Sequence, residues 1–242
     1  MSSSRLLSLM LLLSFSLLFQ LSLGANPISY SCYGSGNFTP NGDYNKNLNT
    51  LLTTLNTETP TTGFADGSLG QSPNQTYGLA LCRGDINTTY CQACIDEATN
   101  EIQNVCQLKY EAVIWYDVCE VKYSNLSFLG NVCTQEWSSY RSTANASNPV
   151  NFNETVVELL SQLKENATGS PNMYAAGQLG IGNSTTVYGY VQCTGDLSGD
   201  NCATCIDFAF DNLLQFSYGR EGGRFLGESC DVRYEVYPFI LA

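Results

Sequence analysis

The sequence predicts an α+β fold made of two tandem modules, each of about 100 residues. The first observation is a duplicated cysteine pattern: the spacing C-x8-C-x2-C begins at Cys82 and returns 111 residues later at Cys193. The second is that each triplet enters an apolar pattern with offsets 0, 3, 4, 7, 11 and 14, which is typical of a helix. The third is that short strand-like segments flank these helices. Each module is therefore predicted to pack two helices on one face of a roughly five-stranded antiparallel sheet.

The N-terminal residues have the pattern of a signal peptide. Arg5 precedes an apolar stretch from Leu6 to about Leu23, and the small residues Gly24 and Ala25 follow. We therefore expect residues 1–25 to be removed and the protein to be secreted; an N-terminal membrane anchor is the alternative. No later run reaches the roughly 18 apolar residues of a spanning helix.

In chain order, module one is predicted to contain a helix over 45–56, a strand over 77–81, a helix that starts at Cys91, and strands over 112–116 and 120–123. Module two repeats this order, with a helix over 154–164 capped by Asn153, a strand over 187–191, a helix that starts at Cys202, and strands over 223–226 and 231–239. Residues 137–151 are rich in Ser, Asn and Ala and are predicted to connect the modules. The expected boundaries are 26–130 for domain one, 131–152 for the start of domain two and the connector, and 153–242 for the rest of domain two.

The composition excludes several classes of function. The chain carries 10 Lys and Arg against 22 Asp and Glu, and this net charge of −12 disfavours nucleic-acid and anionic-membrane partners. Its 11 cysteines and lack of histidine indicate disulfides in an oxidising compartment rather than zinc or Cys-His sites. No glycine motif with a phosphate-binding lysine is present. We therefore expect no enzyme activity, no metal and no cofactor.

Two enzymatic alternatives have a basis in the sequence. The pairs that begin at Cys91 and Cys202 have C-x-x-C spacing at predicted helix starts, which can lower a thiol pKa. Glu228 and Glu235 are a carboxylate pair of the type that hydrolyses glycosides. We do not favour the first, because each of these cysteines has a more distant partner available. We do not favour the second, because acidic residues are scattered throughout this chain.

The cysteine pattern and the module endings resemble plant ginkbilobin-like domains. The residues that carry the resemblance are the two triplets, a further cysteine 25 residues after each, and the endings Cys119-Glu-Val-Lys-Tyr123 and Cys230-Asp-Val-Arg-Tyr234. It covers essentially the whole mature chain. In that family the domain occurs alone in an antifungal, mannose-binding seed protein, in tandem in cysteine-rich repeat secretory proteins of the salt-stress and antifungal type, and in ectodomains of receptor-like kinases.

Spacing alone leaves many disulfide pairings open. The resemblance implies the bridges Cys32–Cys106, Cys82–Cys91, Cys94–Cys119, Cys193–Cys202 and Cys205–Cys230. Cys133 is left over, because Phe216 or Ser217 stands at the place that corresponds to Cys106. One hypothesis is a buried unpaired thiol, with the packing of Phe216 in place of the lost bridge. The other is an intermolecular disulfide, so the protein is expected to be a monomer or a Cys133-linked dimer.

The resemblance also implies a candidate mannose site in module two. The family's Arg and Glu positions match Arg224 and Glu235, and the Asn position is matched loosely by Thr134. Module one has Tyr33, Val113 and Ser124 at these places and is not expected to bind sugar in this way. The alternative is that Glu235 forms an ion pair with Arg233 or Arg224. An odd spacing separates Arg224 from Glu235, so they can share a face only if the chain breaks the strand near Gly227.

These features predict a secreted, glycosylated, non-enzymatic binding protein of the plant apoplast with a defence or stress role, and with mannose-type glycans as candidate ligands of module two. The alternative is a protein-interaction module for receptor-like kinase ectodomains, without lectin activity. Eight sequons are candidate glycosylation sites: Asn37, Asn74, Asn87, Asn125, Asn145, Asn153, Asn166 and Asn183.

Overall fold

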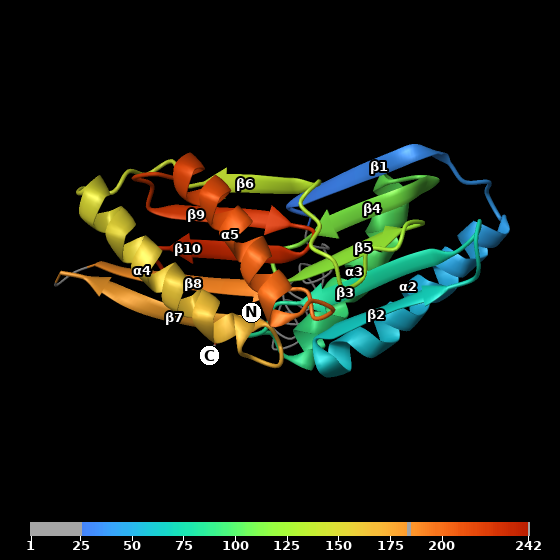
Figure 1. The fold of residues 1–242 in the computed structure, drawn as a ribbon, viewed down its shortest axis with the longest axis horizontal. Helices are drawn as coiled ribbons and strands as arrows, with labels where there is room; N and C mark the ends of the chain where they lie inside the picture. The colour runs from blue at the N-terminus through green and yellow to red at the C-terminus, as the bar shows by residue number, and fades with distance from the viewer. Residues whose placement is uncertain (1–25, 183–184, 242) are drawn as a thin grey trace, which may run out of the picture.

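The computed structural model describes residues 26–182 and 185–241. It contains two five-stranded antiparallel sheets, and two helices cover one face of each sheet (Figure 1). In the view of Figure 1, the helices of module two lie in front of their sheet and those of module one lie behind theirs. The predicted fold class is confirmed. The predicted signal peptide lies outside the described residues, and none of the described helices is long and apolar enough to cross a membrane.

The two modules have the same strand order. Module one contains β1 (Ser29–Asn37), α2 (Asp43–Thr62), β2 (Phe64–Leu69), β3 (Thr76–Cys82), α3 (Thr88–Val105), β4 (Lys109–Trp115) and β5 (Cys119–Ser124), in the sheet order β1-β4-β5-β3-β2. Module two contains β6 (Trp137–Arg141), α4 (Pro149–Thr168), β7 (Tyr174–Ile181), β8 (Thr185–Cys193), α5 (Gly199–Phe216), β9 (Gly222–Gly227) and β10 (Cys230–Glu235), in the order β6-β9-β10-β8-β7. The duplication seen in the cysteine spacing therefore extends to the whole topology.

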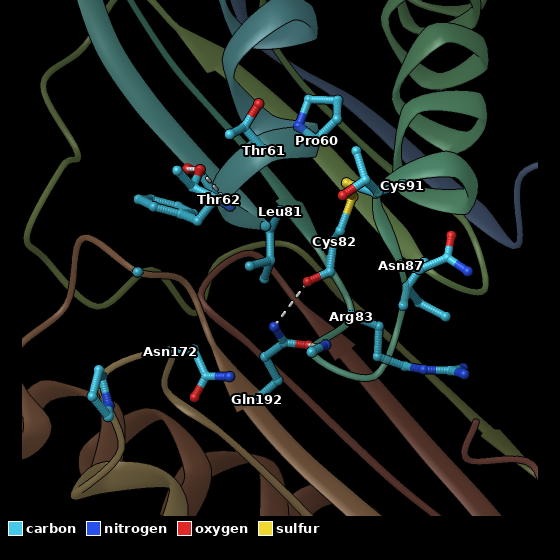
Figure 2. A pocket seen from close by; sticks show the side chains of 17 residues that line it. Pro60, Thr61, Thr62, Leu81, Cys82, Arg83, Asn87, Cys91, Asn172 and Gln192 are labelled. Atoms are coloured by element: carbon cyan, nitrogen blue, oxygen red, sulfur yellow. Dashed lines mark hydrogen bonds between the residues drawn. A yellow bond between two sulfur atoms is a disulfide. The ribbon is translucent and has the colours of Figure 1, made fainter. Parts of the chain in front are cut away.

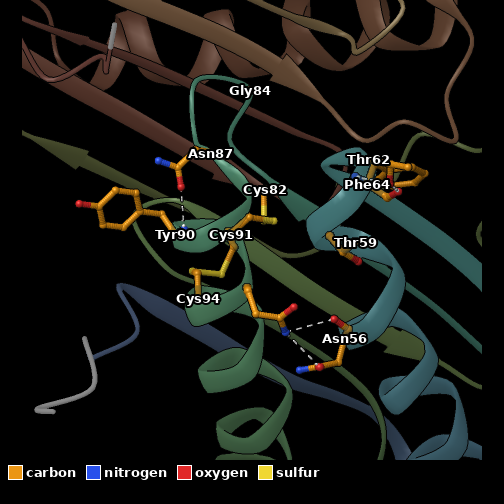
Figure 3. The surroundings of a disulfide bond; sticks show 12 residues. Asn56, Thr59, Thr62, Phe64, Cys82, Gly84, Asn87, Tyr90, Cys91 and Cys94 are labelled. Atoms are coloured by element: carbon orange, nitrogen blue, oxygen red, sulfur yellow. Dashed lines mark hydrogen bonds between the residues drawn. A yellow bond between two sulfur atoms is a disulfide. The ribbon is translucent and has the colours of Figure 1, made fainter.

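The first helix is longer than predicted and passes through a proline. Helix α2 buries Leu48, Leu52 and Leu55 and continues to Thr62, although Pro60 lies inside it. Proline has no N–H group, so the carbonyl oxygen of Asn56 loses its helical donor. That oxygen instead accepts a hydrogen bond of 3.4 Å from Gln92 Nε2 of α3, and Figure 3 shows Asn56 facing α3. Contact with α3 thus supports the last turn of α2.

The predicted connector over residues 137–151 is wrong. Its first part forms β6, the edge strand of the second sheet, which pairs with β9 from Trp137 opposite Gly227 to Arg141 opposite Gly223. Helix α4 then begins at Pro149 rather than at residue 154, and Asn148 caps it in place of Asn153. An edge strand needs few buried side chains, and β6 has none. Proline is favoured at the first helical position, which Pro149 takes in α4.

Five disulfides join the cysteine pairs that the family resemblance implies: Cys32–Cys106, Cys82–Cys91, Cys94–Cys119, Cys193–Cys202 and Cys205–Cys230. In each module, two bridges connect the helix after the triplet to two neighbouring strands. Each bridge can contribute roughly 2–4 kcal/mol to a module of this size.

The bridge that module two lacks is replaced by a different contact than predicted. In strand register, Cys32 lies opposite Ala112 and Arg141 opposite Gly223, so Arg141 takes the place of Cys32. Ser217 caps α5 where Cys106 caps α3. The Arg141 guanidinium donates to the Phe216 carbonyl oxygen at 2.8 Å and lies 4.6 Å from the centre of the Phe216 ring. The ring itself is 40% exposed and does not fill a core position.

Cys133 occupies neither of the two positions that correspond to the bridge Cys32–Cys106 of module one. It precedes β6, it is unpaired, and it is half-buried rather than buried as one hypothesis held. Its backbone N–H donates to Ser229 Oγ at 2.9 Å, which anchors the loop to module two.

Thiol titration of the denatured, unreduced protein is expected to find one free thiol per chain. Cys133→Ser is expected to give none and to leave the folded protein unchanged. A wild-type chain without a titratable thiol, migrating as a dimer on non-reducing gels, would show instead that Cys133 links two chains.

Candidate functional site

The two modules meet through a closely packed interface with approximate two-fold symmetry. Trp115 of β4, Val113 and Leu226 of β9 form a small buried cluster there, and Trp115 Nε1 donates to the Gly227 carbonyl oxygen at 3.2 Å. Matched glycines on either side accommodate aromatic rings. A Cβ at Gly195 would collide with the Phe64 ring, and one at Gly84 with the Tyr174 ring.

An acidic side chain of each module also forms an ion pair with a basic side chain of the other module. Lys122 of β5 pairs with Glu228 of module two at 3.1 Å, with both side chains 2% exposed, and the Tyr33 hydroxyl donates to the same carboxylate. The corresponding residues 111 positions away form the reciprocal pair, in which Arg233 Nη1 lies 3.0 Å from Asp117 Oδ1. Buried charges require partners of this kind, because an unpaired ion in an apolar interior is costly.

Arg224, one of the predicted sugar-binding residues, is buried in this interface. Its guanidinium donates to Asp231 Oδ2 at 2.7 Å and to Asp117 Oδ1 of module one at 2.7 Å. Burial acts to lower its pKa, but the charge of Asp231 and the hydrogen bonds to it outweigh burial and raise the pKa of Arg224 above its ordinary value. The guanidinium thus carries a permanent charge that connects the modules.

Glu235 lies on the same helix-free face of the sheet as Arg224. The chain reverses between β9 and β10, so the strand break that a shared face requires is present. Arg233 Nε donates to Glu235 Oε1 at 3.1 Å, which is the ion pair named as the alternative. Burial raises the pKa of Glu235, and Arg233 opposes the rise.

Thr134 lies at the opposite end of β9 from Glu235. It lies in the loop before β6, at the end of β9 where Trp137 opposes Gly227, whereas Glu235 opposes Gly222 at the other end. Gly222 and Gly227 are five residue steps apart along β9, about 17 Å. The structure therefore brings Arg224 and Glu235 to one face but does not bring Thr134 to them.

Strand register identifies Ser142 as the residue that the loose alignment missed. Because Arg141 corresponds to Cys32, the residue after the first cysteine position is Ser142 rather than Thr134. Its N–H donates to the Gly222 carbonyl oxygen at 2.8 Å, at the end of β9 where Glu235 lies. The sugar-binding role of Arg224 and Glu235 stays a prediction, with Ser142 as the hydroxyl that lies nearest in register.

A cleft of about 650 Å³ lies where both modules contribute to its lining. Figure 2 shows Asn172 and Gln192 of module two facing Thr62 and Leu81 of module one across it. Gln192 crosses between the modules, because its Nε2 donates to the Cys82 carbonyl oxygen at 3.0 Å and its Oε1 accepts from the Gly84 N–H at 3.3 Å.

The wall of the cleft that belongs to module one is held rigidly. The disulfide Cys82–Cys91 forms part of it and ties the end of β3 to the first turn of α3. Asn87 caps that helix, since its Oδ1 accepts the Tyr90 N–H at 3.0 Å, as Figure 3 shows. The cleft is therefore a preformed feature rather than a gap between loose loops.

A buried carboxyl group in the interface gives a testable pH dependence. Glu120 is buried, and one of its carboxyl oxygens has no hydrogen-bond partner among the described residues. Burial raises the pKa of Glu120 well above its ordinary value. The charge of Lys122 opposes this rise in pKa, and the charge of Glu228 adds to it. The folded state then holds a proton that the unfolded state releases above about pH 4.5, so stability falls as pH rises, by up to about 1.4 kcal/mol per pH unit. Glu120→Gln is expected to flatten the fall of Tm with rising pH above about pH 4.5. An unchanged slope in this variant would show that Glu120 does not bind the proton.

Comparisons with known proteins agree with this architecture. The family described as Salt stress response/antifungal matches residues 31–126 and 132–237, one match per module. An antimicrobial ginkbilobin-2-like protein of Castanea crenata is 42% identical over 89% of this chain and 90% of its own length. Cysteine-rich repeat secretory protein 38 of Arabidopsis thaliana is 39% identical over 85% of this chain and 82% of its own. The tandem DUF26 ectodomain of the Arabidopsis thaliana receptor-like protein PDLP8 has the same fold, with a TM-score of 0.77 at 24% identity over 88% of this chain and 98% of that one.

Proposed function

Because this chain belongs to the salt stress response/antifungal family, we propose that it is a non-enzymatic binding protein with a defence or stress role in the plant apoplast. Its relatives include secretory proteins, and the chain is a secreted, extracellular protein. The observation that best supports a binding role is the cleft of about 650 Å³ between two disulfide-stapled modules. Concave sites of a few hundred Å³ that combine apolar walls with a few polar groups are typical ligand sites.

A fungal growth assay tests the defence role. Purified wild-type protein is expected to slow hyphal extension in a concentration-dependent way and to sediment with hyphal cell walls. Reduced and alkylated protein, which has lost its five bridges, is expected to do neither. Wild-type protein that neither binds walls nor slows growth would contradict the antifungal form of the proposal.

Mannose binding by module two is the narrower form of the proposal. Arg224 and Glu235 share a helix-free face and Ser142 lies at the same end as Glu235, which favours it. The guanidinium of Arg224 already binds Asp117 and Asp231, so a sugar hydroxyl would have to displace a carboxylate. Calorimetry with mannose tests whether module two binds this sugar. If it does, the wild type releases or absorbs heat on titration, and Glu235→Gln binds mannose at least tenfold more weakly. Glu235 is the better probe, because Arg224→Ala would also disturb the interface.

A second candidate function is protein interaction along one edge of the molecule. The edge strands β1 and β6 lie along the same side in Figure 1 and touch where Ser29 Oγ lies 2.9 Å from Ser138 Oγ. Exposed aromatic side chains on this edge include Tyr30 and Trp137. Unpaired strand edges and exposed aromatics favour protein partners. Binding to a tandem receptor ectodomain that Tyr30→Asp abolishes would favour this function, and binding unaffected by that change would exclude this edge.

A further inference from the structure

We propose that the cleft between the modules is a binding site for a neutral di- or trisaccharide, separate from the face that carries Arg224 and Glu235. The inference rests on the proposed binding role and names a ligand class for it. Its basis is the position of the cleft, the charge of its walls, the hydrogen-bonding groups left free there, and a glycosylation sequon at its rim.

The cleft lies where the symmetry of the chain brings matched segments together. Thr62 and Asn172 take corresponding places at the starts of β2 and β7, and Leu81 and Gln192 take corresponding places in β3 and β8. Gly195 also lines the cleft, and the Phe64 ring packs on it. Both modules must therefore be docked for the site to exist.

The walls carry no free charge among the described residues. Arg83 is the charged side chain of the lining, and its guanidinium binds Asp85 through two hydrogen bonds of 2.6 and 2.9 Å. Figure 2 shows this guanidinium on the side of the cleft away from Asn172 and Gln192. An ionic ligand would find no counter-charge here, and burying an unpaired charge is costly. The ligand is therefore neutral.

Several amide and hydroxyl groups of the lining keep hydrogen-bonding capacity. Within the described residues, the hydroxyls of Thr61 and Thr88 and the Nδ2 of Asn172 have no hydrogen-bond partner, and Gln192 uses one of its two N–H groups. Such groups can donate to and accept from sugar hydroxyls. The prolines, Ile86 and the disulfide provide apolar surface for the C–H face of a sugar ring. A cleft of about 650 Å³ is in the size range of sites for small organic ligands.

The saccharide can come from two sources, because a glycosylation sequon lies at the rim of the cleft: a glycan attached to Asn87, or a free oligosaccharide. Asn87 is exposed, lines the cleft and is followed by Thr88 and Thr89, which completes an acceptor sequence. Its Oδ1 caps α3, while its Nδ2 makes no hydrogen bond in the described part of the chain and can carry a glycan without loss of the cap. The core of that glycan can occupy the cleft, or a free oligosaccharide can occupy it when Asn87 is unmodified.

Three variants of the secreted protein separate these sources from each other. Thr89→Ala removes the sequon but keeps Asn87 as the cap. Thr61→Trp, made in the Thr89→Ala background, places an indole over the cleft. Thr54→Trp in the same background is the matched control, because Thr54 is exposed on the same helix and does not line the cleft. Calorimetry uses chitobiose, mannobiose and cellobiose as probes. Glycopeptide mass spectrometry before and after endoglycosidase treatment of the native protein follows Asn87, with the exposed sequon Asn145 as reference.

The proposal expects Thr89→Ala protein to bind at least one probe, with at least a tenfold weaker affinity in Thr61→Trp and no change in Thr54→Trp. If the chain's own glycan is the source, wild-type protein carries a glycan at Asn87 that resists the endoglycosidase longer than that at Asn145, and it does not bind the probes. If the source is external, wild-type protein binds them as Thr89→Ala does. The proposal is overturned if Thr89→Ala binds no probe at millimolar concentration, or if Thr61→Trp binds the probes as tightly as Thr54→Trp. The hyphal assay is independent of this result, so the broader function can stand when this inference fails.

Discussion

Glu228→Ala is expected to lower the free energy of unfolding by about 3–5 kcal/mol, one of the two largest losses expected from a single substitution in this protein. The Glu228 carboxylate is 2% exposed, pairs with Lys122 of the other module at 3.1 Å, and accepts a hydrogen bond from Tyr33. Its removal leaves the Lys122 ammonium buried beside the Phe128 ring without a counter-charge. Denaturant unfolding followed by tryptophan fluorescence measures the loss.

Two controls show whether the loss comes from the unpaired charge. The double variant Glu228→Leu with Lys122→Met removes both charges, and its loss is expected to be much smaller than that of Glu228→Ala. Lys46→Ala breaks the solvent-exposed pair with Asp43 and should cost less than about 1 kcal/mol. A loss in Glu228→Ala no larger than in Lys46→Ala would mean that the pair does not stabilise the interface.

Trp115→Ala is expected to destabilise the protein by about 3–5 kcal/mol and to weaken the coupling between the modules. Trp115 is 2% exposed, packs with Leu226 of module two, and donates to the Gly227 carbonyl oxygen. The other tryptophan, Trp137, is 42% exposed and is the matched control. Equal losses of stability in Trp115→Ala and Trp137→Ala would contradict the role given to the interface cluster.

The fold was largely predictable because its signals are local and occur twice. The cysteine triplets and the helical apolar offsets located α3 and α5, and the same spacing fixed the tandem organisation. Segment 137–141 was assigned wrongly, because an edge strand has few buried residues and its sequence looks like that of a loop. The contact of Arg141 with Phe216 was missed for a related reason, since the register of β6 is needed to match Arg141 with Cys32.

The site was less predictable, because it depends on surfaces that meet only in the tandem unit. In β5, Glu120 and Lys122 alternate with Val121 and Tyr123, a pattern typical of a strand with one face in solvent. Module two covers that face, and all four residues are buried. One signal was available: Gln192 is a polar residue in an apolar strand, where the first copy has Leu81, and it is the residue that bridges the modules at the cleft. Thr134 was matched through Cys133, but strand register places Arg141, eight residues later, at the position of Cys32.

The interface contacts make the two modules one cooperative unit, and the cleft is a product of their docking. Differential scanning calorimetry of the unreduced wild-type protein tests it most directly. The interface predicts a single transition whose van't Hoff and calorimetric enthalpies agree, at a value on the order of 150 kcal/mol for a chain of this length. Two resolved transitions, or a van't Hoff enthalpy near half the calorimetric value, would show that the modules unfold independently and would contradict the claim.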